Sequence, residues 1–316
     1  MPDTTLSGYL HHQYLHSLSE FGTPTYLPRS GGWILKRQIG NTAYQDGIGG
    51  YPLFLCQDWS PLSVDLQHLQ DRLVSLAIVT DPFGNYTETH LRHCFKDVVS
   101  PFKVHFIVDL SLPLEKSVSS HHRYYARKSS NAATILPVEE PVTQLEEWCS
   151  LYTNLVKRHD IRGLKAFSKF AFQQQLSVPG IVAFQAQTQD RLLGMHLWYV
   201  VDEYAYHHLS AYSDTGYRQR VSYGLMWTAL SYFQERGLRF LDLGGGAGLQ
   251  DQVDGLTKFK AGWTILTRPV FFCGRILNAT LYNRLNTLAG SPKTNYFPIY
   301  RDGEFITQQK NYVGAA

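Results

Sequence analysis

The chain has 316 residues, more than one hydrophobic core usually supports, so we expect two domains of roughly 150 residues. Hydrophobic residues make up 44% and charged residues 17%, a composition typical of packed globular proteins rather than disordered ones. A formal charge of +3 is too small for a general nucleic-acid binder and predicts no DNA partner.

The chain lacks the sequence features of secreted, membrane-spanning and zinc-binding proteins. Its four cysteines are far apart and form no CxxC pair, so neither a zinc ribbon nor a disulfide framework is indicated. No segment approaches the ~20 apolar residues that cross a bilayer, and we expect a cytoplasmic protein without a transmembrane segment. We expect no metal, because the histidines near the N-terminus lack carboxylate partners.

The first half alternates between strand-like and helix-like patterns. We expect strands at residues 33–39, 74–79 and 104–108, with helices at 62–73 and 86–95. Asp109 follows the third strand, where a carboxylate can line a substrate cleft or form a turn.

The segment Ser119–Lys128 predicts a basic helix. Serines at its start can cap the helix, and Arg123 and Arg127 are one turn apart on the same face. Together with His122, these guanidinium groups can bind a phosphate, although a solvated basic face is the alternative interpretation.

A short acidic stretch between two prolines, Pro137–Pro141, cannot continue a helix and indicates the boundary between the domains. We place one domain at residues 1–138 and the other at 139–316. The second domain should open with helices at 142–158 and 165–176.

Three strands are predicted next, at residues 181–187, 192–201 and 204–212. The tight turns between them force antiparallel neighbours. Alternate side chains of the third strand face a cleft or the opposite side, and the pattern does not decide which. Tyr212 is our candidate catalytic residue on this strand.

A basic turn follows the three strands and leads into an amphipathic helix at residues 223–236. Arg218 and Arg220 lie just ahead of this helix, where the positive end of its dipole favours anions, so we expect them to bind phosphate. A strand at 238–243 then ends in the glycines 244–246.

The string Asp242–Gly248 also resembles the first glycine loop of methyltransferases that use S-adenosylmethionine. That loop opens a doubly wound sheet and must be followed by several βα units of ~30 residues each. Only 73 residues follow Leu243, and the strands that precede it are joined by tight turns rather than arranged as βα repeats, so the methyltransferase interpretation fails.

Three segments carry a resemblance to a known family, at residues 223–227, 237–246 and 255–263. They resemble the Gcn5-related N-acyltransferase (GNAT) superfamily, in the FemAB/BioF2-like branch of Fem-type aminoacyltransferases and related N-acetyltransferases. The resemblance implies an α/β (α+β) fold of tandem GNAT-like domains, each a mixed, mostly antiparallel sheet flanked by helices. It also implies a donor cleft in residues 139–316 and an acceptor side in residues 1–138.

The resemblance implies transfer of an acyl group from acetyl-CoA or another acyl-CoA to the amine of a small, sugar or amino-acid acceptor. One motif departs from the superfamily pattern. The usual Gln/Arg-x-x-Gly-x-Gly/Ala loop is reduced here to two arginines and the final Gly224. Because the Fem-like branch can take aminoacyl-tRNA, a tRNA-dependent transferase stays an alternative, although the modest charge favours CoA. A non-catalytic protein that binds a phosphorylated ligand is a further alternative.

Acyl transfer to an amine requires a deprotonated amine, a polarised carbonyl and a stabilised leaving group. Lys260 is our first candidate for the electrostatic role, and a lysine extended into solvent is the alternative. Asp242 can orient or deprotonate the amine, or hold a structural hydrogen bond. Backbone amides of the glycines can form a phosphate or oxyanion nest.

The remaining candidates are grouped by role. No Gly-x-Ser-x-Gly elbow or Cys/His pair is present, so we expect direct transfer. The candidate cofactor-binding residues are Arg218, Arg220, Gly224, Gly244, Gly245 and Gly246. The candidate substrate-binding residues are Asp109, His122, Arg123, Arg127 and Phe259.

Overall fold

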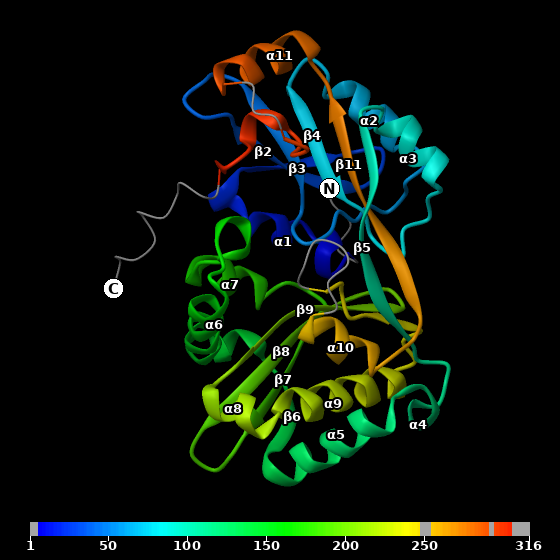
Figure 1. Ribbon diagram of the computed structural model, residues 1–316, viewed down its shortest axis with the longest axis vertical. Helices are drawn as coiled ribbons and strands as arrows, with labels where there is room; N and C mark the ends of the chain where they lie inside the picture. Colours follow the sequence, from blue (N-terminus) through cyan, green and yellow to red (C-terminus); the bar gives the residue numbers. More distant parts are fainter. Residues whose placement is uncertain (1–5, 247–253, 291–293, 305–316) are drawn as a thin grey trace. The chain divides into compact units, whose positions relative to one another are not determined.

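The computed structural model describes residues 6–246, 254–290 and 294–304, which cluster into two compact units (Figure 1). Of the described residues, unit 1 contains 6–14, 102–161, 167–246 and 254–270. Unit 2 contains 15–101, 162–166, 271–290 and 294–304. Both units are therefore assembled from separate segments of the chain.

This division does not follow the single boundary predicted after residue 138. Strand β5 (Val98–Asp109) and helix α5 (Ser120–Ala132) precede that boundary, whereas β10 (Phe240–Asp242) and α9 (Val221–Glu235) follow it. Because β5 pairs with β10 and α5 packs on α9, segments from both sides of the boundary build unit 1.

Unit 2 contains a mixed sheet with the strand order β1-β2-β3-β4-β11, in which only β3 and β4 are parallel. The strands are β1 (Thr23–Leu27), β2 (Gly32–Gln38), β3 (Gln45–Gly49), β4 (Ser75–Val79) and β11 (Thr267–Ile276). The helices of five or more residues along this part of the chain are α1 (His12–His16), α2 (Leu62–His68), α3 (Glu88–Cys94) and α11 (Ala279–Leu288). Its core is apolar and includes Leu66, Ile78 and Phe95.

Unit 1 contains the sheet β5-β10-β9-β8-β7-β6, in which β9 and β10 are parallel and the other pairs are antiparallel. Besides β5 and β10, the strands of this sheet are β6 (Thr134–Val138), β7 (Ile181–Gln187), β8 (Leu192–Val201) and β9 (Tyr204–Tyr212). The three strands predicted from tight turns are thus present as β7, β8 and β9, in the antiparallel arrangement expected.

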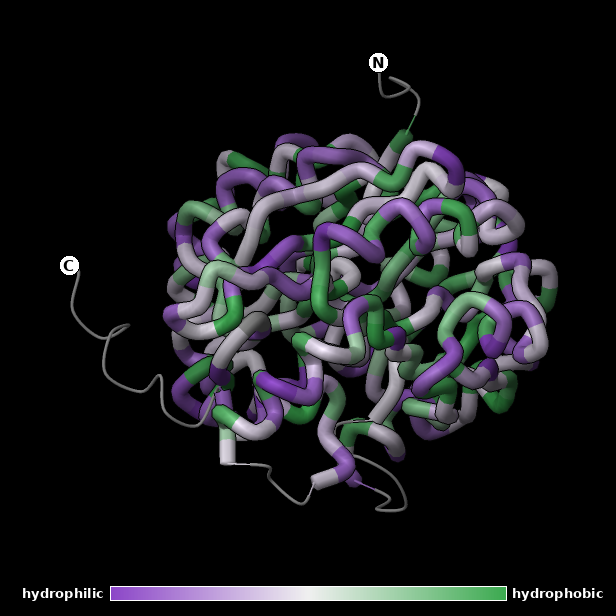
Figure 2. The backbone as a smooth tube through the Cα atoms, turned by 90° about the horizontal axis from the view of Figure 1, so that it is seen from above, coloured by the Kyte–Doolittle hydropathy of each residue, from purple (hydrophilic) through white to green (hydrophobic). Residues whose placement is uncertain are grey.

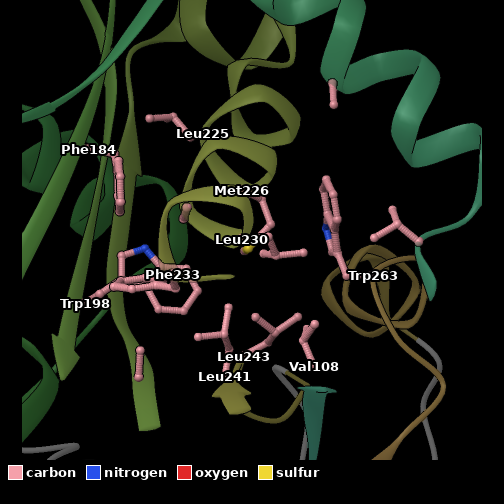
Figure 3. Close-up of a cluster of buried hydrophobic side chains, with 14 of the residues drawn as sticks. Val108, Phe184, Trp198, Leu225, Met226, Leu230, Phe233, Leu241, Leu243 and Trp263 are labelled. Carbon is pink, nitrogen blue, oxygen red and sulfur yellow. The ribbon is translucent and has the colours of Figure 1, made fainter. Parts of the chain in front are cut away.

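Helices α9 and α5 lie side by side on one face of this sheet (Figure 1). Figure 3 shows Phe233 of α9 against Trp198 of β8, and Leu225 of the same helix on the side of Phe184 of β7; all four are buried. Helix α6 (Leu145–His159) packs on β9 and β8, and α7 (Lys169–Gln175) packs on α6. The amphipathic pattern of α9 is therefore explained by one face that fills the core of unit 1.

Several elements differ from the sequence-based expectation. The predicted basic turn before α9 contains a short helix, α8 (Asp214–Gln219), and a further helix, α10 (Gly255–Ala261), precedes Trp263. Side-chain caps at Ser213 and Asp254 start these two helices. Such short helices carry too few apolar positions for a periodic pattern.

No helix among the described residues is long and apolar enough to cross a membrane. Figure 2 shows hydrophobic and hydrophilic segments interspersed along the chain, so the apolar residues come in short runs. This pattern agrees with two units that each bury their own core.

Candidate active site

The candidate site lies where the neighbouring parallel strands β9 and β10 separate. Strand β10 pairs with β9 only from Phe240–Tyr204 to Asp242–Tyr206, although β9 continues to Tyr212. The chain of β10 stays with β5 instead, since the amide of Leu243 donates to the carbonyl of Phe106. Beyond Asp242, the two parallel strands are no longer joined by their ladder.

A β-bulge in β9 lies next to this point. Trp198 of β8 is paired with His207 and Leu197 is paired with Leu209, so His208 is the extra residue. A bulge of this kind reverses the alternation of side chains further along the strand.

The bulge decides which side chains of β9 face the α9 side of the sheet. The ring of His207 stacks on Trp198, with the centroids 4.6 Å apart, and Tyr212 hydrogen-bonds to Nε2 of His196 at 2.7 Å. His207 also lies near His196, at 4.8 Å between ring centroids. His208 faces the other side, where Tyr9 Oη lies 2.9 Å from its Nδ1. Tyr212 is thus buried in a hydrogen bond, and burial raises its pKa.

Asp242 lies at the point where β10 leaves β9 and forms a buried pair with His105 of β5. The Nδ1 atom of His105 is 2.8 Å and 3.0 Å from the two carboxylate oxygens, and one of these oxygens accepts the amide of Gly244 at 2.7 Å. Both side chains are almost fully buried, at 7% and 3% exposure. A catalytic role of Asp242 stays a prediction, and the structure shows that its hydrogen-bond partner is His105.

Lys260 of α10 extends toward the glycine loop that follows Asp242. Its Nζ donates to the carbonyl of Gly245 at 2.6 Å, and only 7% of the residue is exposed, so the interpretation as a solvated lysine is wrong. Burial lowers the pKa of Lys260 to about 8, and Lys103 adds to this effect, while Asp242 opposes it. A Cβ on Gly244 would lie 3.1 Å from Nζ, so a glycine at that position leaves room for the amine.

Lys103 provides a second cation at the glycine loop. Its Nζ donates to the carbonyl of Gly246 at 2.8 Å. Two lysines from different elements therefore hold consecutive carbonyls of the loop, which adds positive charge where a donor's anionic group or a developing oxyanion would lie. His207 lies near this charge, and burial, together with His196 and Lys260, holds its pKa well below the usual range.

Helix α10 is held in position by His122 of α5. Nε2–H of His122 donates to the carbonyl of Phe259 at 2.8 Å, and Ser119 Oγ–H donates to Nδ1 at 3.0 Å. A Cβ on Gly262 would come within 1.9 Å of the His122 ring. The structure thus places His122 under α10, where burial lowers its pKa, rather than in a basic face exposed to phosphate.

The predicted phosphate-binding arginines lie at the start of α9. Arg220 caps the helix in a left-handed conformation with φ of 56° and stacks on Tyr125, at 4.1 Å to the ring centroid. Arg218 donates to Thr215 Oγ1 at 2.9 Å, and both arginines are exposed. Gly224 has a packing role, since a Cβ there would lie 2.4 Å from Ile135.

Three other candidates lie apart from the Asp242–Lys260 region. Asp109 is paired with Phe240 at the opposite end of β10, and its carboxylate accepts the amide of Ser111 at 3.0 Å, as in a turn. Arg123 donates to the carbonyl of Glu115, and Arg127 is exposed. Their predicted role in substrate binding remains a prediction.

Phe259 packs against Tyr223 and Trp263, at 5.0 Å and 5.8 Å between ring centroids. It is therefore part of the aromatic contact between α9 and α10. No group of three or more metal-ligating side chains occurs within the described ranges.

Comparison with known proteins gives a match to part of this chain. Residues 119–253, less than half of the chain, match the family model described as the Acetyltransferase (GNAT) domain. This segment is similar to a GNAT acyltransferase domain and includes Asp242 and α9. The predicted fold class, a mixed and mostly antiparallel sheet flanked by helices, and the assignment as an acyltransferase are confirmed. A comparison with curated proteins finds no match.

Solved structures extend the fold similarity of this chain beyond the matched segment. FemX is 14% identical, with 89% of this chain and 94% of FemX covered at a TM-score of 0.62. The C-terminal domain of a putative lysylphosphatidylglycerol synthetase from Agrobacterium fabrum is 15% identical, with 90% and 92% covered at a TM-score of 0.61. L-PGS from Bacillus licheniformis is 12% identical, with 92% and 100% covered at 0.53. The resemblance to the Fem-like branch is thus confirmed at the level of the fold.

Sequence analysis missed His105 and Lys103 at the candidate site, and for His207 it left open which side of the strand the side chain faces. Lys103 and His105 alternate along β5, and two polar side chains on one face of a mostly apolar strand were the available signal. Asp109, the candidate predicted from this strand, shares this periodicity but lies at the other end of β10.

Proposed function

We propose that this chain is an N-acyltransferase that moves an acyl group directly from a CoA thioester to an amine. One observation carries the proposal: β10 leaves β9 at Asp242, and the buried cation of Lys260 lies at that point. Unpaired strand edges can hydrogen-bond an extended thioester, and a nearby ammonium group stabilises the oxyanion or the leaving thiolate.

Direct transfer agrees with the chemical state of the four cysteines, Cys56, Cys94, Cys149 and Cys273. Burial raises the pKa of all four thiols, which disfavours the nucleophilic thiolate. An acyl-cysteine intermediate is therefore no part of the proposal.

The alternative donor is an aminoacyl-tRNA. It is favoured by the reduced phosphate loop, in which Gly224 serves helix packing, and by fold similarity to FemX along most of the chain. The name of a second neighbour, lysylphosphatidylglycerol synthetase, describes aminoacyl transfer to a lipid. The small net charge supports CoA, because tRNA recognition relies on extended basic surfaces.

The test is to incubate the purified protein with acetyl-CoA and a panel of amines and to measure free thiol. We expect amine-dependent thiol release, and at least a tenfold lower turnover for Lys260→Ala, because the ammonium group near the reacting carbonyl is lost. Transfer from charged tRNA without thiol release would establish the alternative donor. Binding of CoA without transfer from either donor would indicate a non-catalytic ligand-binding protein.

A further inference from the structure

The buried pair of His105 and Asp242 fixes the tautomer of the neutral imidazole ring. Both oxygens of the Asp242 carboxylate lie within 3.0 Å of Nδ1, and an ionised carboxylate only accepts hydrogen bonds. Nδ1 therefore carries a hydrogen, and in the neutral ring Nε2 carries the lone pair. The amide of Gly244 donates to the same carboxylate and restricts its rotation.

The Nε2 atom of His105 is left for another partner. Within the described part of the chain, both hydrogen bonds of the His105 side chain run through Nδ1 to Asp242. Other histidines of unit 1 show the contrast: His122 uses both ring nitrogens, as does His208, which contacts Tyr9 and Gln175. When one ring nitrogen of a histidine donates to a carboxylate, the other ring nitrogen can accept a proton from a substrate.

The pair lies on the face of the sheet that is turned away from α9. Leu241 and Leu243 point into the core beneath α9 (Figure 3), so Asp242 between them points to the opposite face. His105 shares this face, because it lies two residues from Ile107, the partner of Asp242 in the β5–β10 ladder.

We propose that Nε2 of His105 accepts the proton of the attacking amine, and that Asp242 is the positioning residue that orients the imidazole. The inference rests on the proposed acyl transfer to an amine and deepens it. With the donor's phosphates at Arg218 and Arg220, as the sequence predicts, the donor lies on the α9 side, and the amine approaches from the opposite face. His105 then lies on the acceptor's side of the strand separation.

The proposed step balances as follows. The uncharged amine nitrogen attacks the acyl carbon and forms the C–N bond, while the C–S bond breaks and its electrons leave with sulfur. The proton lost by nitrogen moves to Nε2 of His105 and then to water. The thiolate takes a proton from Lys260 or from water, so that an amine and a thioester give an amide and a thiol.

The decisive experiment compares kcat/KM against pH for the wild type, His105→Ala and His105→Gln. We expect a 10²- to 10⁴-fold loss in both variants, which is the usual size of general-base catalysis, and loss of the acidic limb of the profile. Added imidazole should restore part of the activity of His105→Ala, because it can occupy the vacated space and act as the base. His105→Gln keeps a side chain there and should not be rescued.

A control histidine separates an effect of His105 from a general effect of losing a histidine. His90 of α3 hydrogen-bonds to the carbonyl of Trp59 in unit 2, and His90→Gln should keep the wild-type acidic limb. The titratable and charged groups around the pair are Lys103 on β5, Tyr206 on β9, which is registered with Asp242, and Asp254 and Lys260 on or beside α10.

The tautomer is measured independently of activity by nitrogen NMR of protein labelled at histidine. We expect His105 to be protonated at Nδ1 in the wild type and to lose this preference in Asp242→Asn, whose amide can donate to Nδ1. Wild-type kcat/KM with an unchanged acidic limb in folded His105→Ala would overturn the proposal, as would an Nε2–H tautomer. Failure of CoA as donor, with the same histidine dependence for transfer from charged tRNA, would overturn only the proposed donor.

Discussion

Lys260 is the residue at which burial and charge act against each other most strongly. Because its folded-state pKa of about 8 lies below the usual 10.5, the unfolded chain binds the proton more tightly than the folded protein. Burial of this charge therefore destabilises the fold below about pH 8, by as much as ~3 kcal/mol, and the penalty fades as pH rises toward the unfolded-state pKa.

Lys260→Met removes this penalty, so we expect the free energy of unfolding of the variant to exceed that of the wild type most clearly below pH 8. The difference should shrink between pH 8 and 10.5, which chemical denaturation at a series of pH values would measure. Lys258, exposed on the same helix, provides the control Lys258→Met, for which no such trend is expected. A difference that does not change with pH would contradict the assignment of Lys260 as a buried cation.

Helix α10 is the element whose placement matters most for the site, because it carries Lys260 and rests on His122. Gly262→Ala would drive a Cβ to within 1.9 Å of the His122 ring, so the helix or the ring must move. We expect a loss of roughly 1–3 kcal/mol, in the range of overpacked cores, together with lower turnover. Thermal unfolding and the thiol-release assay would measure both.

The matched control lies in the same helix. A Cβ on Gly255 would meet nothing within 4 Å, and the residue is exposed. Gly255→Ala should leave turnover intact and stabilise the protein by up to about 1 kcal/mol, the helix propensity difference between the two residues. Equal melting temperatures for the two variants would show that α10 does not depend on close contact with His122.

At the scale of the whole molecule, the assembly of unit 1 from separate segments has a testable consequence. A fragment of residues 139–316 lacks β5, α5 and β6, so it leaves β10 without its antiparallel partner and the face of α9 uncovered. We expect this fragment not to unfold cooperatively, whereas co-expression with residues 1–138 should restore a cooperative transition, as followed by circular dichroism. A stable, active fragment 139–316 would show that the boundary predicted from the prolines separates independent domains.

Much of the site's framework was predictable because it depends on local signals. Tight turns predicted β7 to β9, the helical period predicted α9, and the resemblance at residues 255–263 singled out Lys260. Asp109 and Asp242 looked equivalent as carboxylates near strand ends. The antiparallel register separates them, because it opposes Asp109 to Phe240 and Asp242 to Ile107.

The sequence by itself determined the class of fold, the acyltransferase resemblance and the glycine-rich strand end with its lysine, because all of these follow from the order and spacing of neighbouring residues. Only the tertiary structure decided that His105 is the partner of Asp242, 137 residues away, and that Lys260 is buried. Strand pairing and burial depend on which distant segments meet. Neither the two-residue period of a strand nor the composition of a motif carries that information.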